Sequence, residues 1–324
     1  MSRSTVGVAI LALLIASIAL ANSHRFVLTW GATGTGEGEF DAPYHIALDQ
    51  KGFLYVTDSE NARIQKFDGS GNFITSWGKL GTSPGDFNIP SGITVDMDGY
   101  VYVGDSDNHQ IQKFTENGKF VFRFGSFGTG PGRLYFPVGV VVDDEGYIYV
   151  ADSWNNRVQK FDAQGNYVTH FGGFGTRPGS FDLPTGIAID DLGRVVVCDT
   201  KNHRVQIFDK DGTWLHMFGS EGTSPGNFVL PYAIDIGPDG NYYICDSGND
   251  RIQVFTPDAQ FVSTWGIEGT EEGELDLPWG IAVSPGGTVF VADANNDRIQ
   301  VFVPESVPVA PTTWGRLKQK FLSP

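Results

Sequence analysis

Short hydrophobic runs rich in Val, Ile, Phe and Tyr alternate with glycine-containing turns along most of the chain. Within residues 90–125 the runs SGITVD, YVYVGD, QIQKF and FVFRFG are separated by turns that include Asp98-Gly99 and Asn117-Gly118. Asp-Gly and Asn-Gly between β-rich runs are strong hairpin signals. No long stretch of these repeats has an apolar period of about 3.6 residues, as a helix would require. The pattern therefore predicts units of four short antiparallel strands.

The four-stranded unit recurs at a fixed interval. Aspartates are spaced by 47 residues, at Asp58, Asp105, Asp152, Asp199, Asp246 and Asp293. Five residues after each aspartate comes an arginine (Arg63, Arg157, Arg204, Arg251 and Arg298), except in the second copy, which has Gln110. A catalytic site is not normally copied six times, whereas packing contacts are shared by all repeats. We therefore interpret the Asp–Arg pairs as a structural brace of the turn between the second and third strands.

The order of the repeats predicts how the fold closes. Residues 26–31 (FVLTWG) match the fourth strand of other copies, such as residues 261–266, yet precede the first full copy, and the last copy ends at its third strand. We predict an all-β, six-bladed β-propeller of four-stranded blades over residues 26–303, closed by the N-terminal strand. Residues 312–315 are a competing fourth strand, two residues out of phase. The Pro-rich tail, residues 304–324, is expected to be a flexible linker or disordered end.

The first residues differ from the repeats. A positive residue, an apolar run and an Ala-Leu-Ala ending predict a signal peptide over residues 1–21, and hence a secreted or extracytoplasmic protein. An uncleaved membrane tether is the alternative, although the run is short for a spanning helix. The formal charge of −16 becomes −17 without this segment, which contains one Arg and no acid. So acidic a chain disfavours nucleic acid as a partner.

The two cysteines occupy equivalent places in neighbouring repeats. Cys198 and Cys245 are 47 residues apart, so their side chains point the same way from adjacent blades. This geometry favours buried thiols over a disulfide. An oxidising compartment leaves a disulfide open as the alternative.

The Asp-x-x-Asn-x-Arg-Ile/Val-Gln pattern resembles the NHL repeat, most closely at residues 202–206 (NHRVQ) and 108–112 (NHQIQ). The resemblance covers about residues 26–302 and implies a propeller. NHL proteins include RNA-binding proteins, sensor ectodomains and the peptidyl-hydroxyglycine amidating lyases, so the family alone does not fix a function.

The resemblance also implies a test for lyase activity. In the amidating lyases three histidines hold zinc, each directly after the proline that begins the first strand of a blade. Here those positions are Tyr44, Ser91, Val138, Thr185, Tyr232 and Trp279. His45 lies one place later. The expected zinc ligands are missing, which disfavours a metal-dependent lyase, but this function, or that of a hydrolase related to the sugar lactonases, remains the alternative.

Positions that differ between repeats are candidates for a binding site on the face that carries the second-to-third-strand turns and the interblade connectors. The aromatics Tyr44, Tyr232 and Trp279 fall on contiguous blades, with Asp250 and Asp297 in turns beside them and Trp154 at another turn tip. These groups suit a protein, peptide or carbohydrate ligand. Alternatively, the rings plug the channel.

No catalytic residues and no cofactor are predicted, apart from a structural Ca²⁺ in the central channel, for which Asp235 is a weak candidate ligand because it replaces small or apolar residues of other copies. We therefore expect a monomeric binding scaffold.

Overall fold

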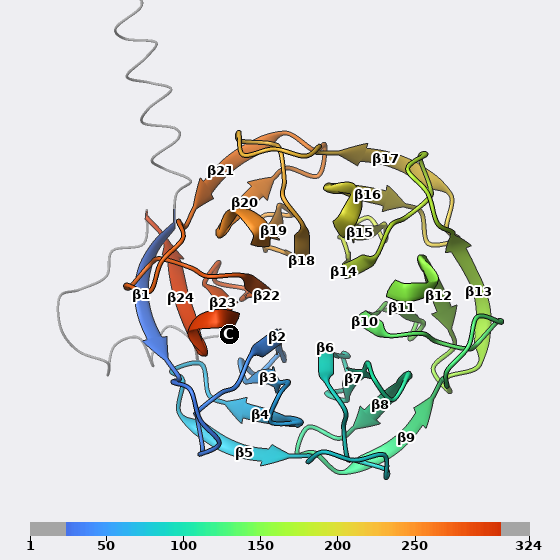
Figure 1. The fold of residues 1–324 in the computed structure, drawn as a ribbon, viewed down its shortest axis with the longest axis horizontal. Coiled ribbons are helices and arrows are strands. Elements are labelled where there is room, and N and C mark those ends of the chain that lie inside the picture. The colour runs from blue at the N-terminus through green and yellow to red at the C-terminus, as the bar shows by residue number, and fades with distance from the viewer. Residues whose placement is uncertain (1–23, 306–324) are drawn as a thin grey trace, which may run out of the picture.

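The computed structural model describes residues 24–305 and consists of six four-stranded antiparallel sheets arranged as blades around a central axis (Figure 1). The predicted fold class is confirmed. In blades one to five, strands a to d run in sequence order from the axis to the rim, and in blade six the N-terminal strand of the chain takes the place of strand d.

The strand bounds repeat closely from blade to blade. Blade one comprises β2 (Pro43–Leu48), β3 (Leu54–Asp58), β4 (Arg63–Phe67) and β5 (Phe73–Trp77); blade two, β6 (Pro90–Val95), β7 (Val101–Asp105), β8 (Gln110–Phe114) and β9 (Phe120–Phe124); blade three, β10 (Pro137–Val142), β11 (Ile148–Asp152), β12 (Arg157–Phe161) and β13 (Tyr167–Gly172). Blade four comprises β14 (Pro184–Ile189), β15 (Val195–Asp199), β16 (Arg204–Phe208) and β17 (Trp214–Phe218); blade five, β18 (Pro231–Ile236), β19 (Tyr242–Asp246), β20 (Arg251–Phe255) and β21 (Phe261–Trp265); blade six, β22 (Pro278–Val283), β23 (Val289–Asp293), β24 (Arg298–Pro304) and β1 (His24–Trp30).

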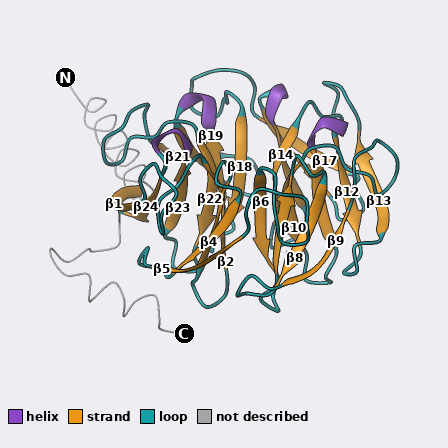
Figure 2. Cartoon of the chain, turned by 60° about the horizontal axis from the view of Figure 1, so that its bottom comes forward, coloured by secondary structure: helices purple, strands orange, loops and turns teal. Residues whose placement is uncertain are grey.

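The turns between strands b and c define one end of the ring. In blades three to six they contain single 3₁₀ turns: η1 (Ser153–Asn155), η2 (Thr200–Asn202), η3 (Ser247–Asn249) and η4 (Ala294–Asn296). Figure 2 shows these turns gathered at one end of the molecule. The connectors from strand d to strand a of the next blade are hydrogen-bonded to the same turns. We call this end, with its b–c turns and d–a connectors, the turn face.

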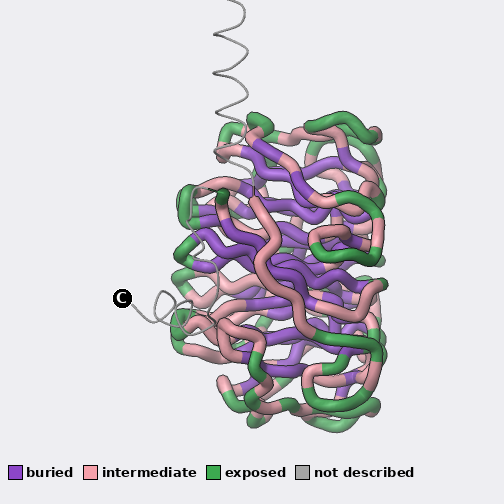
Figure 3. The backbone as a smooth tube through the Cα atoms, turned by 90° about the vertical axis from the view of Figure 1, so that its left-hand side faces the viewer, coloured by how far each residue is buried: buried purple, intermediate pink, exposed green. Residues whose placement is uncertain are grey.

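The hydrophobic core lies between blades rather than within them. One cluster joins Phe40 and Phe67 of blade one to Phe290 and Ile299 of blade six, and all four side chains are buried. Each of the other five clusters likewise combines residues of two neighbouring blades. Buried segments accordingly run through the middle of the ring, and exposed backbone lies along its edges (Figure 3). Because a blade alone would expose both apolar faces, the blades are stable only as a ring.

The ring closes as predicted, through the N-terminal strand. β1 pairs with β24 in antiparallel register from His24↔Pro304 to Trp30↔Ile299, with an irregularity between Phe26 and Leu28. β1 therefore begins two residues before the predicted boundary. The competing strand at residues 312–315, the remaining tail and the predicted signal peptide lie outside the described residues.

A hydrogen-bonded brace fixes each b–c turn to the connector that enters its own blade. In blade three, Asp152 Oδ2 accepts a bond from Arg157 Nε at 2.7 Å, while Oδ1 accepts one from the backbone N–H of Tyr135. The Arg157 guanidinium also donates to the carbonyl oxygens of Thr129 and Arg133. Burial raises the pKa of Asp152, and these hydrogen bonds act in the opposite direction. The brace thus holds every turn and connector of the turn face in the same place.

The same bonds recur in the other blades that have arginine. Their aspartate–arginine pairs, all with the aspartate fully buried, are Asp58–Arg63, Asp199–Arg204, Asp246–Arg251 and Asp293–Arg298. In blade two, Gln110 Nε2 donates to Asp105 Oδ2 at 2.6 Å instead. The cysteines also follow the repeat: Cys198 and Cys245 are free thiols and fully buried, as predicted.

Candidate binding face and central channel

The three aromatics at the start of strand a form one packed cluster. The ring of Tyr44 lies 5.1 Å from that of Trp279 and 5.5 Å from that of Tyr232, and the Tyr232 and Trp279 rings are stacked at 5.9 Å. The Tyr44 and Tyr232 hydroxyls are hydrogen-bonded to each other. Tyr44 is buried, whereas Tyr232 and Trp279 are partly exposed. Burial is the main cause that raises the pKa of both tyrosines, so both remain neutral. The cluster lies where strands β2, β18 and β22 begin, at the turn-face end of the ring.

Asp250 and Asp297 hold the neighbouring connectors. Asp250 Oδ1 accepts a bond from the backbone N–H of Leu277 at 2.8 Å. Asp297 accepts bonds from the Ala42 N–H and, at 2.6 Å, from the hydroxyl of Thr33. Burial raises the pKa of Asp250. Both predicted site aspartates therefore have a structural contact, and both lie in the b–c turns of the turn face.

These aspartates belong to a further repeated position, which the sequence analysis missed. The residue before the brace arginine, or Gln110 in blade two, adopts a left-handed conformation in every blade. As at Asp297, the side chain at this position accepts a hydrogen bond from the backbone N–H of the residue before the strand-a proline of the next blade. The other residues that do so are His109, Asn156, His203 and Asp250. Ala62 has no acceptor to offer at this position. The signal was readable as a preference for Asn, Asp and His.

Trp154 lies at the tip of a b–c turn, with 51% of its surface exposed. Its ring contacts those of Tyr135, at 4.9 Å, and Phe136, at 5.5 Å. Phe127 extends this group, because its ring lies 5.0 Å from Tyr135 and 61% of its surface is exposed. Phe127 was not among the predicted site residues. Its repeat position does vary strongly, as Thr33, Leu80, Phe127, Phe174, Glu221 and Glu268.

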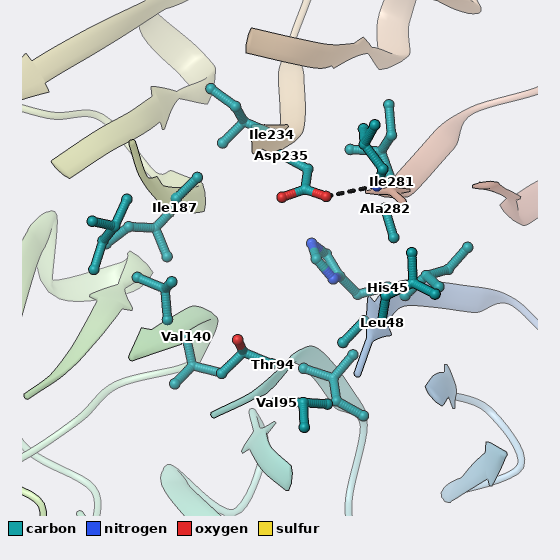
Figure 4. A pocket seen from close by; sticks show the side chains of 17 residues that line it. His45, Leu48, Thr94, Val95, Val140, Ile187, Ile234, Asp235, Ile281 and Ala282 are labelled. Carbon is teal, nitrogen blue, oxygen red and sulfur yellow. Dashed lines mark hydrogen bonds between the residues drawn. The ribbon is translucent and has the colours of Figure 1, made fainter. Parts of the chain in front are cut away.

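The central channel contains a cavity of about 230 Å³ lined mainly by Ile, Val, Leu and Ala of the a strands. Its polar lining residues are His45, Thr94 and Asp235, which come from three different blades, and Figure 4 shows the His45 imidazole directed toward the Asp235 carboxylate. Four other blades have glycine at the position of His45, because the strands approach closely there. A Cβ on Gly92, for example, would lie 2.1 Å from the carbonyl oxygen of Val138.

Desolvation in this narrow channel shifts the two titratable side chains, His45 and Asp235, toward neutrality. Burial raises the pKa of Asp235 to about 6, although its carboxylate accepts bonds from the N–H groups of Ile236 and Val283 at 2.8 and 2.7 Å. Burial lowers the pKa of His45 to about 4, and its buried Nδ1 lacks a hydrogen-bond partner. At neutral pH the cavity therefore contains an ionised aspartate facing a neutral imidazole.

The channel residues fit Ca²⁺ poorly. Calcium takes six to eight oxygen ligands, whereas Asp235 is the sole carboxylate among the lining residues and both of its oxygens accept backbone N–H bonds. Within residues 24–305, no three His, Cys, Asp or Glu side chains gather as a metal site would require. The structural Ca²⁺ stays a prediction.

Six radially arranged sheets with a brace in every blade define a repeat-built β-propeller. The sequence matches the NHL repeat at residues 42–67, 87–114, 134–161, 181–208 and 275–302. The chain belongs to the NHL-repeat propeller family, as its motifs predicted. Residues 228–255 carry the same brace in blade five.

Other comparisons are more distant. Protein lin-41 of Caenorhabditis elegans is 46% identical over 46 residues, a match that spans 14% of this chain and 4% of that protein. A streptogramin B lyase structure is similar with a TM-score of 0.61 and 15% identity, covering 88% of this chain and 98% of that one. The structure of a gluconolactonase of Xanthomonas campestris is similar with a TM-score of 0.64 and 14% identity, covering 89% of this chain and 92% of that one. At these identities the two structures show a shared fold.

The described residues contain no helix long and apolar enough to cross a membrane.

Proposed function

We propose that this NHL propeller is an extracytoplasmic binding scaffold whose turn face holds a protein, peptide or carbohydrate ligand without chemical turnover. The observation that carries the proposal is the half-exposed Trp154, which sits among other aromatic rings on a turn that the brace holds rigid. Large aromatics at the surface are costly to expose and are enriched where proteins bind partners. A rigid frame that presents blade-specific side chains loses little conformational entropy on binding.

The aromatic cluster of Tyr44, Tyr232 and Trp279 would supply a second contact at the channel mouth. Tyr232 and Trp279 keep exposed surface while their rings support each other. The neutral aromatic rings suit contact with an apolar or sugar group. Because Tyr44 is buried and contacts both rings, its role is to position Tyr232 and Trp279.

The test is binding by the triple variant Tyr44→Ala/Tyr232→Ala/Trp279→Ala and by the single variant Trp154→Ala, with circular dichroism to establish that the fold survives. Ligands would come from a displayed peptide library and a glycan array screened with the full chain. Retention of all binding by both folded variants would contradict the proposal.

A metal-dependent lyase or hydrolase is the second candidate, and His45 facing Asp235 inside the central channel favours it. Metal content of protein purified without chelators separates the two functions. A transition metal at near one per chain, lost in His45→Ala, would support the enzyme. Purification without a stoichiometric metal would favour the scaffold.

A further inference from the structure

The turn face is strongly divided in charge. We define the acidic sector as residues 266–277 and 294–297 of blade six with residues 31–42 and 59–62 of blade one. It contains the carboxylates of Glu37, Glu39, Asp41, Glu60, Glu268, Glu271, Glu272, Glu274, Asp276 and Asp297, and it has no Lys or Arg. Most of these acids are exposed. Neighbouring carboxylates that lack cations give a sustained negative potential.

Blades three and four, opposite this sector, have the reverse character. Their equivalent connectors and turns contain three cations, Arg133, Arg177 and Lys201, and one acid, Asp182. All three cations are exposed. Although the chain as a whole is acidic, this part of the turn face carries a net positive charge.

Most of the large exposed apolar side chains of the turn face lie on the blades near the cations; the exceptions are Leu230 and Ile267. We call Leu80, Phe127, Trp154 and Phe174 the apolar arc; they are 73%, 61%, 51% and 76% exposed, on blades two to four. In the d–a connectors of blades five and six, the places of Phe127 and Phe174 are taken by Glu221 and Glu268. Phe127 and Trp154 both contact Tyr135, and exposed apolar groups that gather in this way mark interaction sites.

Phe127 and Trp154 of the arc are held in place before any partner arrives. Phe127 packs against His109 and Tyr135, each with ring centroids 5.0 Å away, and Trp154 packs on Tyr135. His109 itself accepts the backbone N–H of Phe136. A side chain fixed in this way loses little rotamer freedom on binding.

We propose that blades three and four bind an acidic peptide segment of a partner protein, with its apolar side chains on the arc and its carboxylates on Arg133, Arg177 and Lys201. The inference rests on the proposed function and assigns it a region and a ligand class. Charge complementarity selects this partner: a basic segment would be drawn instead to blades six and one. Nucleic acid is disfavoured as the partner, because its phosphates would be repelled by the ten carboxylates on the same face. A second copy of this chain is disfavoured because the two copies are both strongly acidic and repel each other.

The experiment selects ligands from a random displayed-peptide library on the full chain and then measures each by biolayer interferometry. Enriched peptides should combine Asp or Glu with Phe, Trp or Leu. Their affinity should fall at least tenfold in Phe127→Ser/Trp154→Ser and in Arg133→Glu/Lys201→Glu, and should weaken with added NaCl. The matched control is Ile267→Ser, because Ile267 is 65% exposed but lies in the acidic sector; it should bind normally.

Four outcomes would overturn the inference. Peptides rich in Lys or Arg would place the partner on the acidic sector. Peptide binding that is lost in the Tyr44/Tyr232/Trp279 variant but kept in both arc variants would leave the proposed function standing and refute this assignment. If the protein bound phosphatidylcholine vesicles, both arc variants lost that binding, and the selected peptides showed no preference for acidic residues, the ligand would be a membrane surface. Binding unaffected by any variant of the turn face would refute both proposals.

Discussion

Arg123 Nη1 donates a hydrogen bond to the carbonyl oxygen of Thr82 over 2.9 Å. In the other five blades the equivalent carbonyl accepts its bond from the brace arginine of strand c, as Thr35 does from Arg63. Blade two has Gln110 there, whose shorter side chain reaches Asp105 but donates no bond to Thr82. In blade two, Arg123 of strand d therefore donates to the connector the hydrogen bond that the strand-c arginine donates in the other blades.

We predict that Arg123→Ala lowers the free energy of unfolding by about 0.5–1 kcal/mol, since the bond is exposed. Adding Gln110→Arg should recover most of the loss by supplying the usual guanidinium. Urea unfolding followed by fluorescence measures both changes. Ser76→Ala, at the equivalent place in blade one, is the control and should be neutral. A Gln110→Arg/Arg123→Ala chain no more stable than Arg123→Ala would show that the two arginines are not exchangeable.

Replacement of Ala62 should make the fold more stable. Ala62 adopts φ 53° without a side-chain acceptor, whereas Asn156 at φ 54° accepts the backbone N–H of Leu183. Asn tolerates this conformation better than Ala, and its carbonyl would meet the N–H of Ile89. We expect Ala62→Asn to stabilise the protein by about 1 kcal/mol, which calorimetry would detect as a higher Tm. Asn156→Ala should produce a loss of similar size. A lower Tm for Ala62→Asn would mean that the packing around residue 62 excludes the amide.

The channel aspartate predicts a pH-dependent difference between variant and wild type. The folded pKa of Asp235 is raised to about 6, so the folded state binds more protons than the unfolded state between roughly pH 4 and 6. This group therefore contributes stability that is present below about pH 4 and lost as pH rises to about 6. Asp235→Asn removes that dependence.

Relative to wild type, Asp235→Asn should gain on the order of 2 kcal/mol between pH 4 and pH 7.5. Urea unfolding at several pH values measures this. The depressed pKa values of His24 and His45, each about 4, act in the opposite direction but are present in both chains. Repeating the series in a His45→Gln background checks whether the facing imidazole contributes. A variant-to-wild-type difference that is constant with pH would contradict the raised pKa.

Removal of β1 should open the ring. A chain beginning at residue 32 would leave the edge of β24 unpaired and expose Phe302 and neighbouring apolar side chains. Unpaired edges associate with other chains, so we expect aggregation or dimers exchanging strands. Light scattering coupled to size-exclusion chromatography compares this chain with one beginning at residue 24. A stable monomer without β1 would show that three paired strands suffice in blade six.

The sequence predicts the fold well because every blade repeats the same pattern of strands, turns and brace residues. The 47-residue spacing of Asp152 and its equivalents fixes blade number, and the match of residues 26–31 to other d strands predicts closure. Side-chain contacts across the ring are harder to foresee. That His45 faces Asp235 depends on the channel width, and the exposure of Phe127 depends on how the connector bends. Neither quantity is expressed in the pattern of one repeat.

The pairing His24↔Pro304 places the two flanking segments at the same end of adjacent antiparallel strands. Tension applied between these segments therefore peels β1 from β24 one hydrogen bond at a time, whereas strands loaded from opposite ends would resist in parallel as a shear joint. The closure that seals the ring against solvent is thus its mechanical release point. If one end were anchored and the other pulled, blade six would open first and present its edge, while the five continuous blades remained intact.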